Sequence, residues 1–555
     1  MAASNAQLQL WLQGNATALE SLQQSYNAIV TSLAALDVRE RGTKRDMDTG
    51  WLVLCGAIVF FMQAGFSMLE AGCVGRKNVI NILFKNIMDG SIAAVCFWLL
   101  GYGFAFGKTA GGFIGTDNFG LRHVYNQVSG DADALAEGEL ISADGAALAS
   151  DGWESFFFQW AFAGTAATIV SGSVAERTRF EAYLLFSALC TLFLYPVVVH
   201  WVWGEGFLSA WGARPDAEEN ARPLLKGNSE SNGMIDFAGS GVVHMVGGCS
   251  GLMGAILVGP RLGRFYDGKP QAMPAHNTTL MSLGTMILWF GWYGFNCGST
   301  LMLSGAGGVS SGGLVAAKVA VTTTISGACG CLVATILSRV FEKTFDIGIA
   351  LNGVLSALVG VTAACSVVDP WHAFVIGSIS PTIYYGAHCL LLRLQIDDPL
   401  DAFPIHGCCG AWGLLSTGIF CVDSNVHYSE SNNSILGNDA CSRGEQFGVQ
   451  LIAVLAIAAW SVTMSGGTFY LMKVTMGLRV PEDVEEEGLD ISEHGGSGYH
   501  DHSNRVVPIS AEGLKEVSKQ PQAVSNNPSR GNSNAVQAFD NSHNQGWGPL
   551  GGEGH

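Results

Sequence analysis

The sequence predicts an all-α polytopic membrane protein with eleven transmembrane helices. Of its 555 residues, 48% are hydrophobic and only 13% are charged, whereas soluble domains carry about 25% charged residues. Apolar runs long enough to cross a bilayer recur eleven times. The net charge of −18 is concentrated in a loop near residues 108–152 and in residues 481–490, and no basic patch indicates a nucleic-acid partner.

The eleven predicted spans begin near residue 49 and end near residue 472. They are 49–69, 87–106, 154–174, 181–203, 234–258, 278–299, 313–337, 347–367, 371–391, 403–421 and 447–472. An odd number of spans places the two termini on opposite sides of the membrane. We take residues 48–473 as one membrane domain in contact with the lipid bilayer.

The cations of the connecting loops predict the orientation of these spans. Loops that follow odd-numbered spans hold eleven Lys and Arg residues, whereas the alternate loops hold six. Because cytoplasmic loops are enriched in Lys and Arg, the N-terminus is predicted outside and the C-terminus inside. A cluster of four cations at residues 39–45 opposes this assignment, but neighbouring acids roughly neutralise it.

Residues 1–47 form an amphipathic segment ahead of the first span. Its apolar residues recur at helix-like spacing, and it lacks the charged start and unbroken apolar core of a cleavable signal peptide. Asn15 begins an Asn-Ala-Thr glycosylation sequence, and Asn432 begins an Asn-Asn-Ser one. Both asparagines are therefore candidate glycosylation sites. Cys421 and Cys441 flank the second sequence and are the two cysteines placed to bridge a loop.

The fifth span carries an acid and a histidine inside an apolar run. In residues 234–258, Asp236 and His244 are the ionisable side chains of interest, and the surrounding positions are rich in glycine. At a rise of about 1.5 Å per residue, His244 lies roughly 12 Å deeper than Asp236. Ionisable residues at such depth usually mark a transport pathway.

The tenth span repeats the pattern of the fifth. It begins with three aspartates in residues 397–401, reaches His406 and continues into small residues. With the predicted topology, spans one to five and six to ten run in opposite senses, as in an inverted five-plus-five repeat. The two imidazoles of His244 and His406 are then expected to meet near the membrane centre.

These residues resemble the ammonium transporter (Amt/Mep/Rh) family, specifically its Amt branch in its plant and algal form. The resemblance covers roughly residues 48–500. The segments that carry it are Gly72–Asn78, Gly172–Arg177, Asp236–Gly254, Gly259–Phe265, Trp289–Asn296, Thr322–Thr324, Asp397–Gly413 and Gly477–Gly496. It implies a homotrimer in the plasma membrane, with one pore per subunit that carries ammonium, or methylammonium as an analogue, inward with high affinity.

The resemblance also implies a recruitment site at the outer mouth of each pore. Trp203 matches the family's vestibule tryptophan, Ser299 the vestibule serine and Asp236 the buried acid near the site. A cation over an indole face gains on the order of 1 kcal/mol or more when partly desolvated. Asp236 has a second interpretation as a helix N-cap, because aspartate accepts hydrogen bonds from free N–H groups there.

Four further matches define the expected pore. Phe162 and Phe295 match a stacked phenyl pair that closes it, and His244 and His406 match the paired histidines that line it. Moving an intact cation through such an apolar constriction costs several kcal/mol. We therefore expect ammonium to lose a proton at the vestibule and to pass as ammonia, with a proton carried separately. The alternatives are an ammonium sensor on the same fold and an electroneutral Rh-type ammonia channel.

No catalytic residue, cofactor or metal is expected. The Cys408–Cys409 pair beside His406 lacks the four-ligand set that thiolates need for zinc, and packing explains these small side chains better. The sequence is therefore interpreted as that of a transporter rather than an enzyme.

The C-terminal tail divides into two parts. Residues 474–500 resemble the family's cytoplasmic regulatory segment, and Ser492 occupies the place of a phosphorylatable threonine in related plant proteins. A kinase acting there would add a charge of about −1.5 to −2 beside Asp490 and Glu493. Residues 501–555 are rich in Asn, Ser, Gly, Gln and Pro, a composition typical of disorder.

Overall fold

The structure is a computed structural model, and it describes residues 11, 14–122, 152–209, 233–304, 312–429, 441 and 443–499. The described residues belong to one compact unit. Asn432, most of the acidic loop and the C-terminal residues 501–555 lie outside the described residues.

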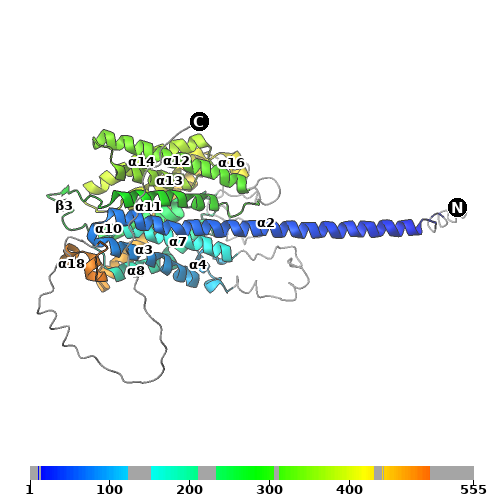
Figure 1. The fold of residues 1–555 in the computed structure, drawn as a ribbon, viewed down its shortest axis with the longest axis horizontal. Coiled ribbons are helices and arrows are strands. Elements are labelled where there is room, and N and C mark those ends of the chain that lie inside the picture. Colours follow the sequence, from blue (N-terminus) through cyan, green and yellow to red (C-terminus); the bar gives the residue numbers. More distant parts are fainter. Residues whose placement is uncertain are drawn as a thin grey trace, which may run out of the picture. The chain divides into compact units, whose positions relative to one another are not determined.

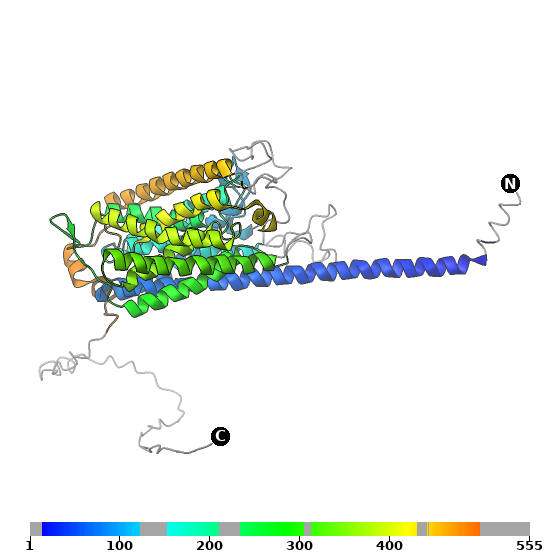
Figure 2. The ribbon, with the colours of Figure 1, turned by 90° about the horizontal axis from the view of Figure 1, so that it is seen from above.

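The described chain is a bundle of helices (Figures 1 and 2). Its first half contains α2 (Ala16–Cys73), η1 (Arg76–Asn78), α3 (Val79–Cys96), η2 (Phe97–Gly101), α4 (Tyr102–Phe106), η3 (Phe119–Leu121), α7 (Trp153–Ser173), α8 (Phe180–Leu189), η4 (Cys190–Leu194), α9 (Tyr195–Val202), η6 (Ser240–Met245) and α10 (Val246–Val258). Its second half contains α11 (Thr278–Trp292), η7 (Tyr293–Cys297), α12 (Gly312–Phe341), α13 (Ile347–Thr362), α14 (Pro370–Arg393), η8 (Phe403–Cys408), α15 (Cys409–Phe420), α16 (Asp423–Ser429) and α17 (Arg443–Thr475). The short helices α18 (Glu482–Glu487) and α19 (Leu489–His494) follow.

Two small antiparallel hairpins complete the described secondary structure. In the first, β1 (Thr109–Ala110) pairs with β2 (Ile114–Gly115), and in the second, β3 (Phe265–Tyr266) pairs with β4 (Lys269–Pro270). Both hairpins lie in connections between helices, so the architecture is helical, as the apolar runs predict.

Each predicted apolar run coincides with a helical segment. Among the described residues, seven helical segments are long and apolar enough to cross a membrane, and Ile347–Thr362 is a shorter apolar helix. The seven are Ala18–Cys73, Arg76–Phe106, Phe180–Val202, Ser240–Val258, Gly312–Phe341, Pro370–Arg393 and Gly444–Thr475. The chain is therefore a multi-pass membrane protein.

Several helices begin at residues that satisfy their free N–H groups. Asn277 accepts a hydrogen bond from the Leu280 amide ahead of α11, and Asp346 accepts one from the Ile349 amide ahead of α13. Asp369 and His372 form a capping box at the start of α14, where Pro370 is the first helical residue. These caps define where the spans of the second half begin.

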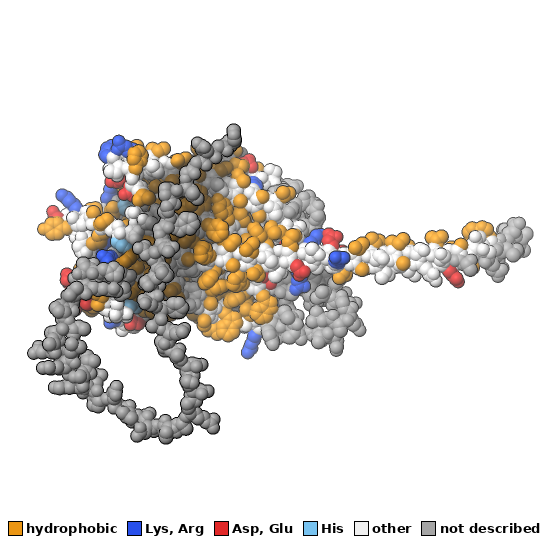
Figure 3. Space-filling view, viewed as in Figure 1, with side chains coloured by type: hydrophobic (Ala, Val, Ile, Leu, Met, Phe, Trp, Pro, Cys, Tyr) orange, Lys and Arg blue, Asp and Glu red, His pale blue; other side chains and the backbone are white. Residues whose placement is uncertain are grey.

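Figure 3 shows apolar side chains gathered over the middle of the bundle, with charged side chains toward its two ends. Exposed apolar side chains include Phe60 and Phe61 of α2, Met286 of α11 and Leu455 of α17. Such a belt on the outside of a helical bundle is typical of a surface that faces lipid or a partner subunit.

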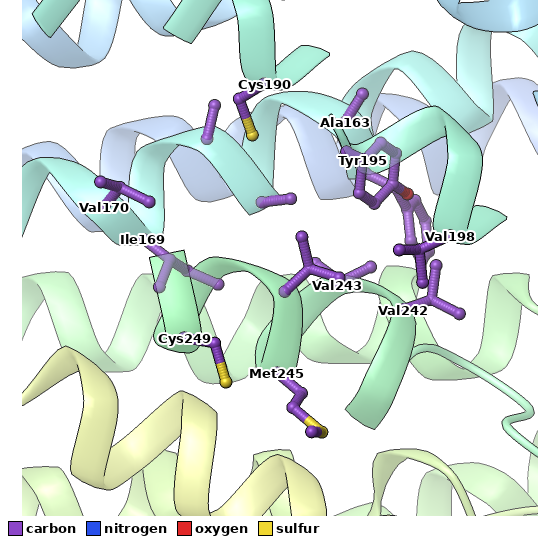
Figure 4. Packing of buried hydrophobic residues seen from close by; sticks show 14 of the residues in the cluster. Ala163, Ile169, Val170, Cys190, Tyr195, Val198, Val242, Val243, Met245 and Cys249 are labelled. Atoms are coloured by element: carbon purple, nitrogen blue, oxygen red, sulfur yellow. The ribbon is translucent and has the colours of Figure 1, made fainter. Parts of the chain in front are cut away.

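The buried interior surrounds η6 and α10. Figure 4 shows Val242 of η6 near Val198 of α9 and Val243 of η6 toward Ile169 of α7, and all four belong to one buried cluster. Where α10 meets η8, glycines allow the backbones to touch, because a Cβ atom on Gly248 would lie 2.2 Å from the Gly407 nitrogen. Close approach through small residues is how membrane helices gain packing contacts.

The helix α2 runs without interruption through the expected boundary between residues 47 and 48. At that point it is attached to the bundle, because the Asp48 carboxylate accepts hydrogen bonds from the Leu303 and Ser304 amides at 2.7 and 2.8 Å. Its N-terminal half extends beyond the bundle, at the end opposite α18 (Figures 1 and 2). Residues 16–47 of the amphipathic segment are thus the start of the first span's own helix.

The segment after α17 folds back onto the other end of the bundle. Lys77 Nζ donates to the Glu485 carbonyl at 2.8 Å, and the Leu489 amide donates to the Asn78 side chain at 2.9 Å. The Asp490 carboxylate accepts from the Asn81 amide at 2.9 Å. The turn η1 and the first residues of α3 therefore provide the docking surface for α18 and α19.

Candidate functional site

The two histidines of the repeated pattern lie in contact. Their Nδ1 atoms are 3.2 Å apart and their rings are tilted by 23°, with centroids 5.2 Å apart. His244 is 0% exposed and His406 is 6% exposed. Because one nitrogen of this hydrogen bond must donate and the other accept, the pair shares a proton between the two rings.

A column of aromatic rings continues from the histidines. His244 stacks on Phe295 at a centroid distance of 5.4 Å, and Phe295 stacks on Phe162 at 4.0 Å with 24° between the planes. Phe162 and Trp203 in turn form a T-shaped pair with centroids 5.9 Å apart. The structure therefore places five predicted residues, from Trp203 through the phenyl pair to His406, in one continuous column of rings.

Both histidines lie on π-helical turns. His244 belongs to η6, His406 to η8, and each turn leads directly into an α-helix, α10 or α15. Such turns are rare and occur often at functional sites. The turn η6 begins after Gly239 at φ = +106°, where a Cβ atom would lie 3.1 Å from the Trp203 ring. Glycine is thus required both for the backbone and for the ring beside it.

Trp292 supports the histidine pair and was not singled out from the sequence. Its ring lies parallel to that of His244, with centroids 5.2 Å apart and 16° between the planes. Its Nε1 donates to Thr362 Oγ1 at 3.0 Å, and the side chain is fully buried. The only sequence signal was its place in the aromatic segment Trp289–Asn296, which does not distinguish it from its neighbours.

Trp203 and Ser299 are each tied to the phenyl pair. Trp203 contacts Phe162 through its ring, and Ser299 Oγ donates to the Phe295 carbonyl at 2.8 Å. Both side chains are partly exposed. No hydrogen bond joins Trp203 to Ser299 within the described chain. Trp203 thus adjoins Phe162 through its ring, whereas Ser299 adjoins Phe295 through the backbone.

The Asp236 carboxylate faces the start of η6. It accepts four backbone hydrogen bonds at 2.8–2.9 Å, from Gly239, Ser240, Gly241 and Val242. Its own carbonyl accepts the Trp203 Nε1 hydrogen bond at 2.8 Å. The contacts of the Asp236 carboxylate are thus those of a helix N-cap, since each carboxylate oxygen accepts hydrogen bonds from two N–H groups.

Asp398 holds the same place before the second histidine. It precedes His406 by eight residues, the separation of Asp236 from His244, and its Oδ2 accepts from the Phe403 amide at 2.8 Å. The neighbouring Asp397 instead binds Arg261, and Asp401 binds His388. The eight-residue spacing was the signal in the sequence that identifies Asp398 among the three aspartates.

An ion network lies outside the spans, in the loops near α18. Arg261 Nε donates to Asp397 at 2.8 Å, Arg264 lies 3.2 Å from the same carboxylate, and Arg261 also pairs with Glu176. Burial raises the pKa of Asp397, but the Arg261 hydrogen bonds and charge outweigh it and lower the pKa to about 2. For Glu176, burial is likewise outweighed by Arg261, so its pKa lies below the ordinary value.

A buried polar cluster between α2, α3, α7 and α8 was not predicted. Glu70 accepts from Ser171 and Asn86, while Asp89 accepts from Tyr183 at 2.5 Å. Within the same region the Lys85 ammonium lies over the Tyr183 ring at 5.1 Å. Among the described residues, no group of three or more His, Cys, Asp or Glu side chains is placed to hold a metal ion.

The remaining predicted residues lie away from the aromatic column. Cys421 and Cys441 form a disulfide. Asn15 donates through its side chain to the Trp11 carbonyl at 2.8 Å. Ser492 is exposed on α19, where its hydroxyl donates to the Gly488 carbonyl at 2.9 Å.

Comparisons with known proteins give a consistent family. The sequence model of the Ammonium Transporter Family matches residues 50–499. Ammonium transporter 1 member 1 of Oryza sativa is 40% identical over 83% of this chain and 87% of its own length. Ammonium transporter Amt2 of Archaeoglobus fulgidus is 37% identical over 82% of this chain and 88% of its own.

Solved structures agree with these relatives. A protein described as Sensor Amt Protein superimposes with a TM-score of 0.67 at 32% identity, covering 82% of this chain and 99% of its own. Mep2 of Saccharomyces cerevisiae superimposes with a TM-score of 0.65 at 28% identity, covering 83% of this chain and 93% of its own.

Proposed function

The chain belongs to the ammonium transporter family and is an ammonium transporter, and from that premise we propose how its geometry moves the substrate. Ammonium is recruited beside Trp203 and Ser299, loses a proton there and passes the phenyl pair as ammonia. The ammonia then continues along the two histidines, while the proton travels separately. The single observation that supports this mechanism is the continuous column of rings from Trp203 to His406.

The phenyl pair excludes the intact cation. With centroids 4.0 Å apart, the rings of Phe162 and Phe295 are in van der Waals contact and leave no passage for a hydrated ion. They offer no oxygen to replace the water that ammonium or potassium would lose. Ammonium escapes this cost by giving up a proton, whereas potassium has none to give. Brief ring displacement then admits neutral ammonia.

The recruitment step relies on two partly exposed side chains. The indole of Trp203 is held by its hydrogen bond to the Asp236 carbonyl and is partly exposed, and a cation would bind against its ring. Ser299 donates its proton to the Phe295 carbonyl, so its oxygen lone pairs are left as acceptors. Asp236 contributes its negative charge, and its hydrogen bonds hold both Trp203 and η6 in position.

The histidine pair receives ammonia below the phenyl rings. His244 Nε2 has no hydrogen-bond partner among the described residues, so it is available to the substrate. The Nδ1 contact fixes which nitrogens face each other and keeps one shared proton in the pair. If the proton that ammonium releases passes through the pair and leaves on the inner side, transport is electrogenic.

The arrangement in the membrane follows the same proposal. We assign eleven spans, with the N-terminus outside and the C-terminus inside, as an inverted five-plus-five repeat in a plasma-membrane homotrimer. Support comes from the eleven apolar runs that coincide with helices and from the matching Asp236–His244 and Asp398–His406 spacings. The opposite positions of α18 and the N-terminal half of α2 agree with an odd number of crossings (Figure 1).

Residues 474–500 act as a regulatory segment in this proposal. Lys77, Asn78 and Asn81 hold α18 and α19 against the end of the bundle. Ser492 is exposed within the docked segment and is accessible to a kinase. Phosphorylation would place a third negative group beside Asp490 and Glu493 and so favour release.

Ammonium-evoked current and uptake of labelled methylammonium in oocytes test this function together. Saturable inward current with methylammonium uptake supports the electrogenic mechanism. Uptake without current indicates conduction of neutral ammonia alone, and the absence of both signals in correctly inserted protein contradicts a transport function.

A further inference from the structure

The N-terminal half of α2 carries a heptad repeat. Six apolar residues follow one another at steps of three, four, three, four and three positions, the spacing of a coiled-coil interface. We call them the apolar seam: Leu19, Leu22, Tyr26, Ile29, Leu33 and Leu36. In heptad notation Leu19, Tyr26 and Leu33 are a positions, whereas Leu22, Ile29 and Leu36 are d positions.

The apolar seam is uncovered in the single chain. Its six side chains are between 49% exposed, at Leu19, and 69% exposed, at Leu22. A single exposed leucine is ordinary, but a row of six on one face of one helix is not. The seam therefore needs an occupant.

Lipid is not that occupant. The helix is continuous from Ala16 to Cys73, and Asp48 attaches it to the bundle where the first span begins. At about 1.5 Å per residue, Leu36 lies about 18 Å and Leu19 about 44 Å beyond Asp48 along the axis. A helix that continues the axis of a spanning helix leaves the bilayer and does not lie in its surface.

Another copy of the same helix fits the seam. Copies that share one membrane are parallel and stand at the same height, so each a position faces an a position and each d position a d position. The flanking e and g positions from 23 to 32 are uncharged, so no like charges oppose the contact. These flanking residues are Gln23, Ser25, Val30 and Ser32. The opposite face is polar, with Glu20, Gln24, Asn27 and Thr31.

We propose that residues 19–36 of α2 from the copies in one transporter assembly wind into a parallel, in-register coiled coil beyond the membrane-embedded bundle. The number of strands, three, rests on the homotrimer of the proposed function. A coil of this length is marginal for free peptides. The tethered copies, however, meet at a high effective concentration because their bundles already adjoin. The coil thus adds a second contact that holds the assembly together.

Cysteine cross-linking of the full-length chain in membranes tests the contact. Leu22→Cys and Ile29→Cys place a thiol at d positions, and Gln24→Cys and Thr31→Cys place one on the opposite face as matched controls. After mild oxidation we expect covalent dimers on non-reducing gels from the d-position variants only. The unaltered chain gives the background from its own cysteines. Equal cross-linking from both faces, or none from either, overturns the proposal.

Assembly mass provides a second, independent readout. The double change Leu22→Glu with Ile29→Glu places charge in the seam, whereas Gln24→Glu with Thr31→Glu places the same charge outside it. We expect the first variant to lose its oligomeric mass in detergent at a lower temperature than the second. An identical temperature for both variants contradicts the coil.

Neither readout depends on transport. Protein that cross-links but takes up no methylammonium supports the coil and contradicts the proposed function. Protein that takes up methylammonium but does not cross-link contradicts the coil and supports the proposed function.

Discussion

His244 and His406 share a hydrogen bond between their Nδ1 atoms, 3.2 Å apart, although 162 residues separate them in the chain. The contact is made where α10 and η8 approach each other closely at Gly248 and Gly407. Because both rings are buried and only one proton fits between them, the two residues are expected to act as a unit.

Removing either histidine should therefore remove most of the function. We expect His244→Ala and His406→Ala each to lower methylammonium uptake at least about tenfold, as loss of a positioned proton-handling group usually does. The double variant should be no worse than the worse single variant, because the second change removes a group already without its partner. Uptake measured per molecule at the cell surface checks this. If the fold-loss of uptake in the double variant equals the product of the two single fold-losses, the histidines act independently.

The two capping aspartates should behave alike in stability. Asp236→Asn and Asp398→Asn each remove charge-assisted hydrogen bonds to a π-helical turn and should destabilise the protein by about 1–2 kcal/mol. Thermal unfolding of the purified transporter measures this, with uptake recorded in parallel. If Asp236→Asn keeps full stability but weakens only the apparent affinity for methylammonium, its role is electrostatic recruitment and not positioning.

A negative charge at residue 492 should weaken docking of the regulatory segment. Ser492→Asp places a carboxylate near Asp490 and Glu493, which hold Asn81. We expect lower uptake and faster proteolysis of residues 474–500, while Ser492→Ala keeps the behaviour of the unaltered chain. Equal uptake and proteolysis of the two variants would exclude a regulatory role for this serine.

The Arg261–Asp397 pair predicts a specific loss of stability in acid. The pKa of Asp397 is lowered to about 2 from an ordinary value of 3.8, so its carboxylate stabilises the folded state by about 2 kcal/mol above pH 4. That contribution should fade as pH falls from about 4 toward 2, because the unfolded chain then binds the proton more readily. Unfolding temperatures of the unaltered chain and of Asp397→Asn, compared across this range, check the sign. A difference that grows on acidification would contradict it.

The spans were predictable because the bilayer imposes one requirement on all of them. A run of about 20 apolar residues must satisfy its backbone internally and so becomes a helix. The resemblance to the ammonium transporter family is confirmed, since the family model covers residues 50–499. The symmetry of the fifth and tenth spans also led correctly to contact between His244 and His406.

Other features depend on contacts that periodicity does not encode. Trp292 is one of several aromatic residues in its segment, and only packing against His244 and Thr362 distinguishes it. The cluster of Glu70, Lys85 and Asp89 has hydrogen-bond and ring partners from α7 and α8, which come together only when the helices assemble. The segment boundary predicted at residue 47 follows a change in amino-acid composition. The structure has no break there, because α2 continues through it.

The central claim is that the substrate crosses the phenyl pair only after it has lost a proton. Uptake of labelled methylammonium and of rubidium, compared in the same cells, tests it most directly, because rubidium resembles potassium and has no proton to lose. Phe162→Leu opens the constriction, whereas Phe186→Leu changes a phenylalanine stacked on Phe469 at 4.4 Å, away from the pore, and controls for lost packing.

We predict methylammonium uptake without rubidium uptake in the unaltered chain and in Phe186→Leu, and measurable rubidium uptake in Phe162→Leu. Rubidium entry through the unaltered chain at a rate comparable to methylammonium would contradict the account.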